Sequence, residues 1–204
     1  MGKTGLTTGP VGFGGYRIHP SDGTHGKALA LALTRGCNLI DTSSNYTDGG
    51  SESLIGHVLQ ELFSQGKLHR EEVIVVSKVG YMQGENLRVA EEREKTGQPF
   101  PEVVPYVEGC RHCLHPEFLE DQLERSLARL GLECVDVYLL HNPEYFLSYA
   151  RKKQADSLST LRREYYRRIR QAFEWLEQQV ERGRIGSYGI SSNTFPSAAD
   201  DPEA

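Results

Sequence analysis

Four side chains that can hold or transfer a proton stand at or near the ends of apolar runs. Asp41 closes LID, Lys78 closes EVIVVSK, His141 closes CVDVYLLH, and Tyr46 follows Asp41 by five positions. A phenol is a weak acid with an ordinary pKa near 10, and a neighbouring ammonium favours its ionised form. A hydrogen-bonded chain from Tyr46 through Lys78 to Asp41 would therefore be a tuned general acid and base. His141 could hydrogen-bond a substrate carbonyl and orient it.

This set of side chains favours one class of reaction. It contains no obvious nucleophile and no metal-ligand cluster, so we expect no metal. It suits protonation of a carbonyl oxygen while a cofactor delivers hydride to the carbon. Each residue alone has an ordinary structural explanation, such as a turn cap for the Asp or packing for the Tyr. Their conjunction is less ordinary, because buried Asp and Lys are rare unless paired.

The elements that must position these residues alternate along the chain. Apolar runs predict strands at 11–18, 37–41, 72–78, 134–141 and 185–190, and helical spacing predicts helices at 25–35, from Ser51, at 116–130 and at 165–182. Strands and helices in alternation predict an α/β fold with a parallel sheet, either a doubly wound sheet or a (β/α)8 barrel. In both folds the carboxyl ends of the strands carry the site.

Two long segments and the C-terminal end fall outside this alternation. We expect one domain at 1–195, with long irregular loops at about 81–114 and 143–164 and a disordered acidic tail at 196–204. A loop as long as 81–114 is unusual for a simple connection. Its aromatic residues Tyr81, Phe100 and Tyr106 are candidates for substrate contact or for packing against the rim of the fold.

Composition narrows the range of partners. The chain has 204 residues and a formal net charge of −5, which does not favour nucleic acid as a partner. No apolar run approaches the ~18 residues of a membrane span, so we expect a cytoplasmic protein without membrane contact. Its four cysteines then predict free thiols. The sequence predicts no particular oligomeric state.

The ordered set of motifs resembles the aldo-keto reductase family. The matching segments are GFGGY, IDTSSNY, the strand ending VSK, YLLHNPE and GISSN, together with GGSESLIGHVL and LERSLARLGL between them. The resemblance implies an aldo-keto reductase (β/α)8 TIM barrel, here truncated after its fifth strand. It also implies NADPH-dependent reduction of an aldehyde or ketone, or the reverse, on a small-molecule carbonyl or alcohol.

The resemblance assigns roles to particular residues. It makes Asp41, Tyr46, Lys78 and His141 the catalytic tetrad. It makes Gly14, Gly15, Tyr16, Asp41, Ser191, Ser192 and Asn193 the residues that bind the cofactor. The Ser-Ser-Asn motif is one residue longer than the family's Ser-Asn, which leaves open which Ser takes the role. The resemblance places the residues that bind the pyrophosphate and the 2′-phosphate beyond the fifth strand. We therefore expect weak or no NADPH binding by 1–204 alone.

Three other hypotheses stay open at the level of sequence. CRHCLH at 110–115 could be a zinc or redox module, although no second cluster follows it at zinc-finger spacing. TDGGS at 47–51 could hold an anion at a helix N-terminus, although an ordinary glycine turn with Ser51 as the cap is the simpler interpretation. The chain could also be an inactive barrel fragment that serves as an interaction or regulatory module.

Overall fold

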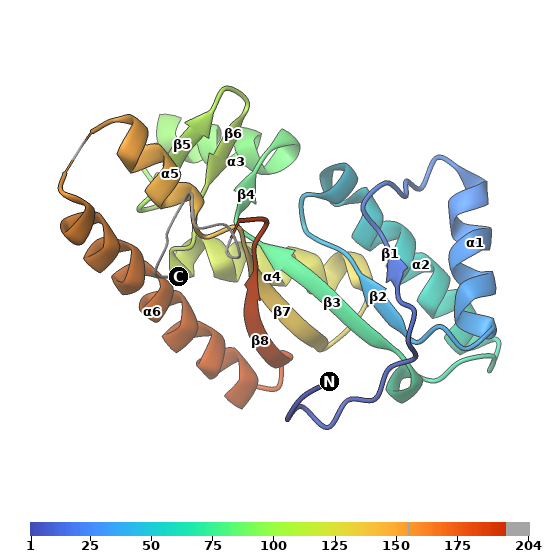
Figure 1. Ribbon diagram of the computed structural model, residues 1–204. Coiled ribbons are helices and arrows are strands. Elements are labelled where there is room, and N and C mark those ends of the chain that lie inside the picture. The colour runs from blue at the N-terminus through green and yellow to red at the C-terminus, as the bar shows by residue number, and fades with distance from the viewer. Residues whose placement is uncertain (155, 195–204) are drawn as a thin grey trace.

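A five-stranded parallel sheet forms the centre of the molecule (Figure 1). The structure is a computed structural model that describes residues 1–154 and 156–194, so the expected tail at 196–204 lies outside the described residues. The strands run in the order β1 (Phe13–Gly14), β2 (Leu39–Asp41), β3 (Ile74–Val79), β7 (Val135–His141) and β8 (Ile185–Ser191).

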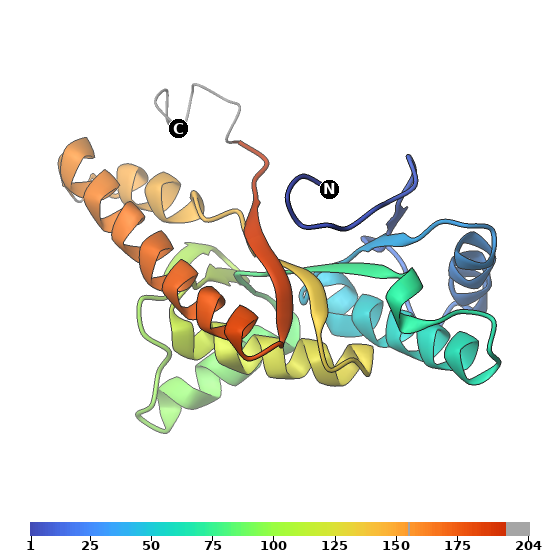
Figure 2. The ribbon, with the colours of Figure 1, turned by 90° about the horizontal axis from the view of Figure 1, so that it is seen from below.

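Helices cover one face of this sheet. Figure 2 shows them along the convex side of the curved sheet, with the N-terminal segment on the other side. They are α1 (Gly23–Thr34), α2 (Gly50–Ser64), α4 (Pro116–Leu130) and α6 (Leu158–Glu181). The main core lies between helices and sheet and contains Val75, Tyr138 and Leu140. A smaller apolar cluster of Ile74, Val76 and Val137, packed with Leu6, Leu39 and Leu139, lies apart from it.

The strand order bears on the two architectures that the sequence left open. Each strand pairs with the next strand of this sheet along the chain, without reversal, whereas a doubly wound sheet reverses direction at a switch point. This unbroken order is therefore compatible with a barrel. Closure is not seen in residues 1–154 and 156–194, because β1 and β8 are the two edges of an open sheet.

The segment 81–114 is not the irregular loop that the sequence predicts. It contains β4 (Tyr81–Met82), α3 (Gly84–Lys95), β5 (Val104–Val107) and β6 (Cys110–His112), and its strands form an antiparallel sheet in the order β4-β6-β5. The helix lacks an apolar stripe, since its buried residues are Asn86 and Ala90. Asn86 is instead held by a pair of hydrogen bonds to Gln122 of α4, which periodicity cannot detect.

The helix ends show which local signals predict well. Pro116 occupies the first turn of α4, and Gly131 follows the helix in the left-handed conformation with φ of 64°, as the sequence predicts. Ser51 is not the cap of α2, because the N-cap is Gly49. α6 begins at Leu158, earlier than predicted, with the Ser157 hydroxyl accepting from the Thr160 amide. α5 (Tyr145–Lys152) and the short helices η1 (Tyr46–Gly49) and η2 (Arg70–Glu72) complete the fold.

Candidate active site

Strand alternation brings three of the four proton-handling residues to one face. Side chains two apart on a strand share a face. Asp41, Lys78 and His141 each lie two residues after a member of the small apolar cluster, which are Leu39, Val76 and Leu139. The three side chains therefore project from the carboxyl ends of β2, β3 and β7 on the sheet face opposite the helices.

Lys78 is the centre of the site. Its ammonium Nζ donates to Asp41 Oδ1 at 2.6 Å, to the Thr42 carbonyl at 2.8 Å and to Tyr46 Oη at 3.2 Å. Lys78 is 4% exposed, so these three acceptors replace the water that the ammonium loses on burial. The side chain of Asp41 stays half exposed, which leaves it open at the mouth of the site.

Tyr46 opens the short helix η1 directly after β2. Thr47 and Asp48 follow it in the left-handed region, with φ of 48° and 57°, a conformation that non-glycine residues adopt only at a cost. Two contacts hold this turn. The Thr47 hydroxyl donates to the Ile18 carbonyl at 2.9 Å, and the Asp48 carboxylate accepts from the Glu85 amide at the start of α3 at 2.9 Å.

His141 is a neutral, buried imidazole. Its Nδ1 lies 3.2 Å from Ser43 Oγ, and its ring meets the Tyr46 ring edge-on with centroids 6.0 Å apart. Burial is the main cause that lowers the pKa of His141 to about 3, and the electrostatic effects of Lys78 and then His112 contribute in the same direction. At neutral pH the ring can orient a substrate but carries no charge.

A cavity of about 450 Å³ opens beside these residues. Tyr46 and His141 line it, together with Tyr16, Asn45, Tyr81, Gln83, Tyr106, Val107, Cys110, Tyr145 and Asn193. No charged side chain is among them. Tyr106 stacks on Tyr145 at 3.8 Å between centroids, and the Tyr81 phenol donates to Tyr145 Oη at 2.7 Å. The wall is therefore aromatic and hydroxyl-rich, and it suits a small uncharged molecule.

The predicted cofactor residues fall at two places around this cavity. At the first strand, the Gly15 amide donates to the Asp41 carbonyl at 2.7 Å. A side chain at Gly15 would come within 2.7 Å of Ser51 Oγ, so the close approach requires glycine. Tyr16 is 63% exposed and meets the Tyr46 ring edge-on at 5.0 Å. Gly14 pairs with Asp41 in the sheet and has open space where a side chain would stand.

At the end of β8, the fifth strand of the sheet, the three residues of the Ser-Ser-Asn motif have different surroundings. Ser191 pairs with His141 in the sheet. The Ser192 hydroxyl donates to Glu144 Oε1 at 2.7 Å. Asn193 lines the cavity, and its backbone amide donates to Asn142 Oδ1 at 3.0 Å. Of the three, Asn193 is the residue that the structure brings to the cavity wall.

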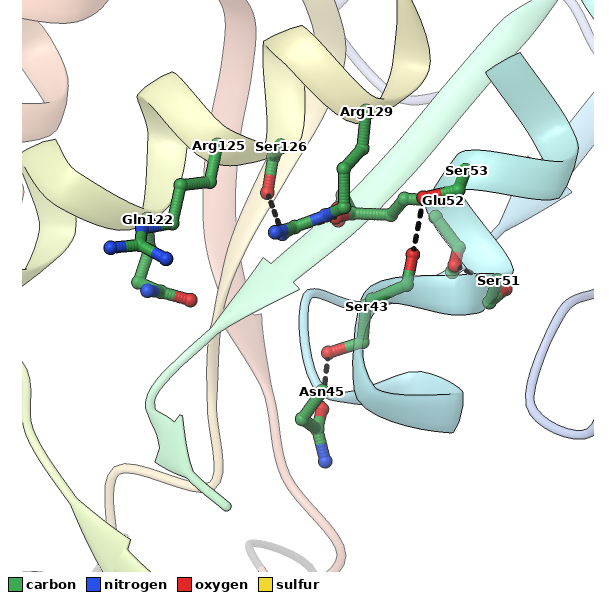
Figure 3. A network of polar contacts seen from close by, with 12 residues as sticks. Ser43, Asn45, Ser51, Glu52, Ser53, Gln122, Arg125, Ser126 and Arg129 are labelled. Carbon is green, nitrogen blue, oxygen red and sulfur yellow. Dashed lines mark hydrogen bonds and ion pairs between the residues drawn. The ribbon is translucent and has the colours of Figure 1, made fainter. Parts of the chain in front are cut away.

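A buried ion pair supports the loop that carries Tyr46. Figure 3 shows Arg129 of α4 beside Glu52 at the start of α2. Arg129 Nη2 lies 2.6 Å from Glu52 Oε2, and Ser77 Oγ donates to Glu52 Oε1 at 2.5 Å. Glu52 is fully buried. This pairing ties α2, α4 and β3 together directly behind the site.

The family model named Aldo/keto reductase family matches residues 6–200. The chain belongs to the aldo/keto reductase family. Aldose reductase B of Dictyostelium discoideum is 26% identical over 200 residues, covering 93% of this chain and 51% of the relative. The NADH-specific methylglyoxal reductase of Escherichia coli is 30% identical over 152 residues, covering 69% of this chain and 40% of the relative. The chain thus spans about half the length of the curated relatives it matches, or somewhat less.

Solved structures of aldo-keto reductases have the same fold. The holo form of an aldo-keto reductase from Bacillus halodurans aligns with a TM-score of 0.63 at 21% identity, covering 92% of this chain and 47% of that one. An aldo-keto reductase from Pseudomonas aeruginosa, recorded as putative, aligns at 0.58 with 26% identity, covering 93% and 57%. This chain therefore shares with these aldo-keto reductases the α/β arrangement of a parallel sheet and helices.

The segment CRHCLH at 110–115, which suggested a zinc or redox module, makes other contacts in this chain. Cys110 lines the cavity, and Cys113 donates to the Pro101 carbonyl in the core. His112 Nε2 donates to the His141 carbonyl, and His115 caps α4. Within the described residues no group of three or more possible metal ligands gathers. Burial raises the pKa of Cys113 to about 12, which disfavours a reactive thiolate.

The turn at TDGGS begins α2 and serves packing. The Ser51 hydroxyl donates to the Gly15 carbonyl at 2.8 Å and lies 2.7 Å from Thr42 Oγ1. The Ser51 hydroxyl is therefore occupied by contacts within the fold. In the described part of the chain, no helix combines the length and apolar character that a bilayer crossing needs.

Sequence reasoning missed part of the cavity wall. Tyr145 lines the cavity, and Asn142, which is not a lining residue, donates from its amide to Tyr81 Oη at 2.6 Å. Asn142 has φ of 50°, and its position directly after the predicted strand end was the available signal. Phe100, a candidate for substrate contact, packs instead on Phe118 at 5.3 Å. Tyr81 and Tyr106 do line the cavity.

Proposed function

We propose that this chain carries the catalytic site of an NAD(P)H-dependent oxidoreductase that reduces an aldehyde or ketone to an alcohol, or performs the reverse reaction. One observation supports this most strongly. A single buried ammonium, Lys78, contacts both the Asp41 carboxylate at 2.6 Å and the Tyr46 phenol at 3.2 Å. A phenol held in this way at the wall of a neutral cavity is placed to donate a proton to a bound substrate.

Each residue then has a role in the proposed reaction. Tyr46 transfers a proton to or from the substrate oxygen. Lys78 donates to the phenolic oxygen and so stabilises negative charge that develops there, while Asp41 balances the ammonium. His141 hydrogen-bonds the same substrate oxygen and fixes its position. The cofactor would supply or accept the hydride at the substrate carbon.

The residues around the cavity fit a nicotinamide. The side-chain amide of Asn193 has no hydrogen-bond partner within the described residues and can bind a carboxamide. Gly14 leaves open space, and Tyr16 presents an exposed ring beside Tyr46. The identity of the cofactor is a separate part of the proposal. We expect NADPH, although one relative is named as NADH-specific.

The fold and setting of the proposed enzyme follow from the same features. Five parallel strands in unbroken order support the proposal that they correspond to the first five strands of a (β/α)8 barrel. The uncharged lining of the cavity favours a small carbonyl or alcohol as the substrate, and a cytoplasmic setting is part of the same proposal.

The test is an assay for turnover with both cofactors. Purified chain is mixed with NADPH or NADH and a panel of small uncharged aldehydes and ketones, and oxidation of the cofactor is followed by its absorbance. Because weak cofactor binding is expected of 1–204 alone, the cofactor is raised to high concentration, and there we expect turnover that needs both carbonyl and cofactor, with the alcohol as the product. Absence of alcohol with every carbonyl and both cofactors would contradict the proposal.

One feature favours a second candidate, an inactive module that binds other proteins. In the described residues β1 and β8 each have one unpaired edge, and such edges are templates for pairing with another chain. This candidate predicts no turnover and a change in hydrogen exchange of the β8 amides when a partner is bound. The assay above separates the two candidates.

A further inference from the structure

The turn that carries Tyr46 has an unusual backbone. Thr47, Asp48 and Gly49 follow it with φ of 48°, 57° and 83°, so three residues in a row are left-handed. Glycine adopts this conformation freely, but for threonine, which is β-branched, it is an outlier. Strained backbone of this kind persists only where the surrounding structure holds it. The position of Tyr46 therefore depends on the contacts that other parts of the chain make with this turn.

One of these contacts comes from the start of α3. Both carboxylate oxygens of Asp48 face the Glu85 amide, which donates to them at 2.9 and 3.2 Å. The first amides of a helix need acceptors from outside it, and in the described structure the N-cap residue of α3, Gln83, provides none from its own side chain. Asp48 supplies the acceptor instead. Gly84 permits the approach, because a side chain there would collide with the Asp48 carboxylate.

A second contact ties the residue before Tyr46 to the same place. Asn45 Nδ2 donates to Gln83 Oε1 at 3.1 Å. Residues on both sides of Tyr46 are thus bonded to residues 83–85, at the start of α3. The Tyr46 phenol accepts from Lys78 Nζ at 3.2 Å, which is the upper end of the usual range for such a hydrogen bond. A small outward shift of the turn would therefore break the bond to Lys78.

We infer that Asp48 is a positioning residue for Tyr46, and that it acts by fastening the strained turn to the start of α3. Asp48 is exposed and is not among the residues that line the described cavity, so it does not contact the substrate itself. Its effect on the reaction passes through Tyr46. The catalytic part of the inference therefore rests on the proposed function, whereas the structural part does not.

The inference gives the segment 81–114 a second role. The residues that this segment supplies to the cavity wall are Tyr81, Gln83, Tyr106, Val107 and Cys110. The start of α3, within the same segment, holds the turn that carries the proton donor. The wall of the cavity and the turn of Tyr46 are therefore joined by direct contacts. A change at the start of α3 should move the phenol even where the residues around Lys78 are untouched.

Two substitutions of Asp48 separate its carboxylate from its backbone conformation. Asp48→Gly suits the left-handed conformation but has no acceptor, whereas Asp48→Asn keeps an acceptor oxygen and also tolerates this conformation. We expect kcat to fall about 10- to 100-fold in Asp48→Gly, as for a misplaced catalytic group, with little change in KM. In Asp48→Asn kcat should stay close to wild type. If Asp48 served the backbone conformation alone, Asp48→Gly would be the better tolerated of the two, and that result would overturn the inference.

Asp22→Gly is the matched control for the loss of a helix cap. Asp22 is also exposed, and its carboxylate accepts from the Thr24 amide at the start of α1 at 2.8 Å. The helix α1 contributes no residue to the lining of the described cavity. We therefore expect kcat of Asp22→Gly to equal that of wild type. An equal fall of kcat in Asp22→Gly and Asp48→Gly would show that Asp48 has no positioning role.

Carbon NMR of tyrosine-labelled chain tests the position of Tyr46 without turnover. The Tyr46 Cζ signal, assigned by its loss in Tyr46→Phe, should move in Asp48→Gly and stay in place in Asp48→Asn and Asp22→Gly. Gly84→Ala disturbs the same contact from the side of α3 and should also move the signal. Its control is Gly97→Ala, because Gly97 follows α3 with φ of 77° and a side chain there would meet nothing within 4 Å among the described residues.

The outcomes of the NMR measurement separate the inference from the proposed function. A Tyr46 signal that stays in place in both Asp48→Gly and Gly84→Ala would overturn the inference, whether or not the chain turns over a carbonyl. A signal that moves as far in Gly97→Ala would overturn it too. A signal that moves as expected in a chain without turnover would support the inference and contradict the proposed function.

Discussion

Lys78 is the residue on which the geometry of the site depends most. Its ammonium contacts Asp41, the Thr42 carbonyl and Tyr46 together. A single ammonium at this position fixes the phenol ring and is placed to stabilise negative charge that develops on the phenolic oxygen during proton transfer. Loss of Lys78 should therefore affect the chemical step before it affects the fold.

Lys78→Met tests this role. We expect kcat for carbonyl reduction to fall by about 10²- to 10⁴-fold, the usual contribution of a positioned acid or base. Stability should fall by about 1–3 kcal/mol, because the buried Thr42 carbonyl loses its donor. Urea unfolding and steady-state kinetics measure the two effects. The exposed Lys67→Met is the control, and unchanged kcat in Lys78→Met would exclude the proposed role.

Two buried histidines predict how stability depends on pH. Burial lowers the pKa of His112 to about 4 and that of His141 to about 3, from an ordinary value of 6.5. As pH falls below 6.5 the unfolded chain takes up these protons first, so stability falls with pH down to about 4 and below. The slope is at most about 1.4 kcal/mol per pH unit for each histidine.

His112→Gln should make this dependence shallower. Glutamine keeps a donor for the His141 carbonyl, which His112 Nε2 contacts at 2.7 Å, but it does not titrate. Urea unfolding at pH 7 and pH 5 gives the comparison. A variant that loses as much stability between the two values as wild type would show that His112 does not carry the effect.

At the scale of elements, the contact between α2 and α4 depends on one glycine. A side chain at Gly56 would lie 2.3 Å from the Arg129 carbonyl and 2.8 Å from Leu130. These are backbone atoms that cannot rotate away. The close approach also brings Arg129 within reach of Glu52, so this glycine helps to place the support behind Tyr46.

Gly56→Ala should destabilise the chain by about 1–3 kcal/mol, the usual cost of overpacking. Gly26→Ala is the matched control, since its side chain would meet only Leu54 and Val58 at 3.5 and 3.6 Å. There a helix-interior alanine should stabilise by about 0.5–1 kcal/mol. Thermal unfolding of both variants is the measurement, and changes of the same sign would refute this view of the interface.

Elements with apolar strands or clear end signals could be predicted from sequence. The apolar run before Lys78 and the Pro116 and Gly131 signals of α4 are examples. α3 could not be, because its buried Asn86 is stabilised by Gln122, far along the chain. Ser51 was predicted as a cap but donates to Gly15, a contact that exists only once the sheet has formed.

At the scale of the whole molecule, register brings the site together. Asp41 pairs with Val76, Lys78 pairs with Leu139, and His141 pairs with Ser191. Each functional residue thus lies two positions further along the ladder than the one before. A shift of one residue would turn these side chains to the opposite face. The sequence could identify the residues at strand ends, but the exact ladder and the three contacts of the Lys78 ammonium required the structure.

The central claim is that Tyr46 is the proton donor of a carbonyl reductase. Tyr46→Phe keeps the ring that packs on Tyr16 and His141 and removes the hydroxyl that Lys78 contacts. The exposed Tyr166→Phe on α6 is the control.

The deciding measurement is kcat of Tyr46→Phe for reduction of a carbonyl that the wild-type chain turns over, with cofactor binding measured beside it. We predict that reduction falls by at least about 10²-fold, with cofactor affinity and Tyr166→Phe unchanged. Reduction by Tyr46→Phe at the wild-type rate would contradict the account.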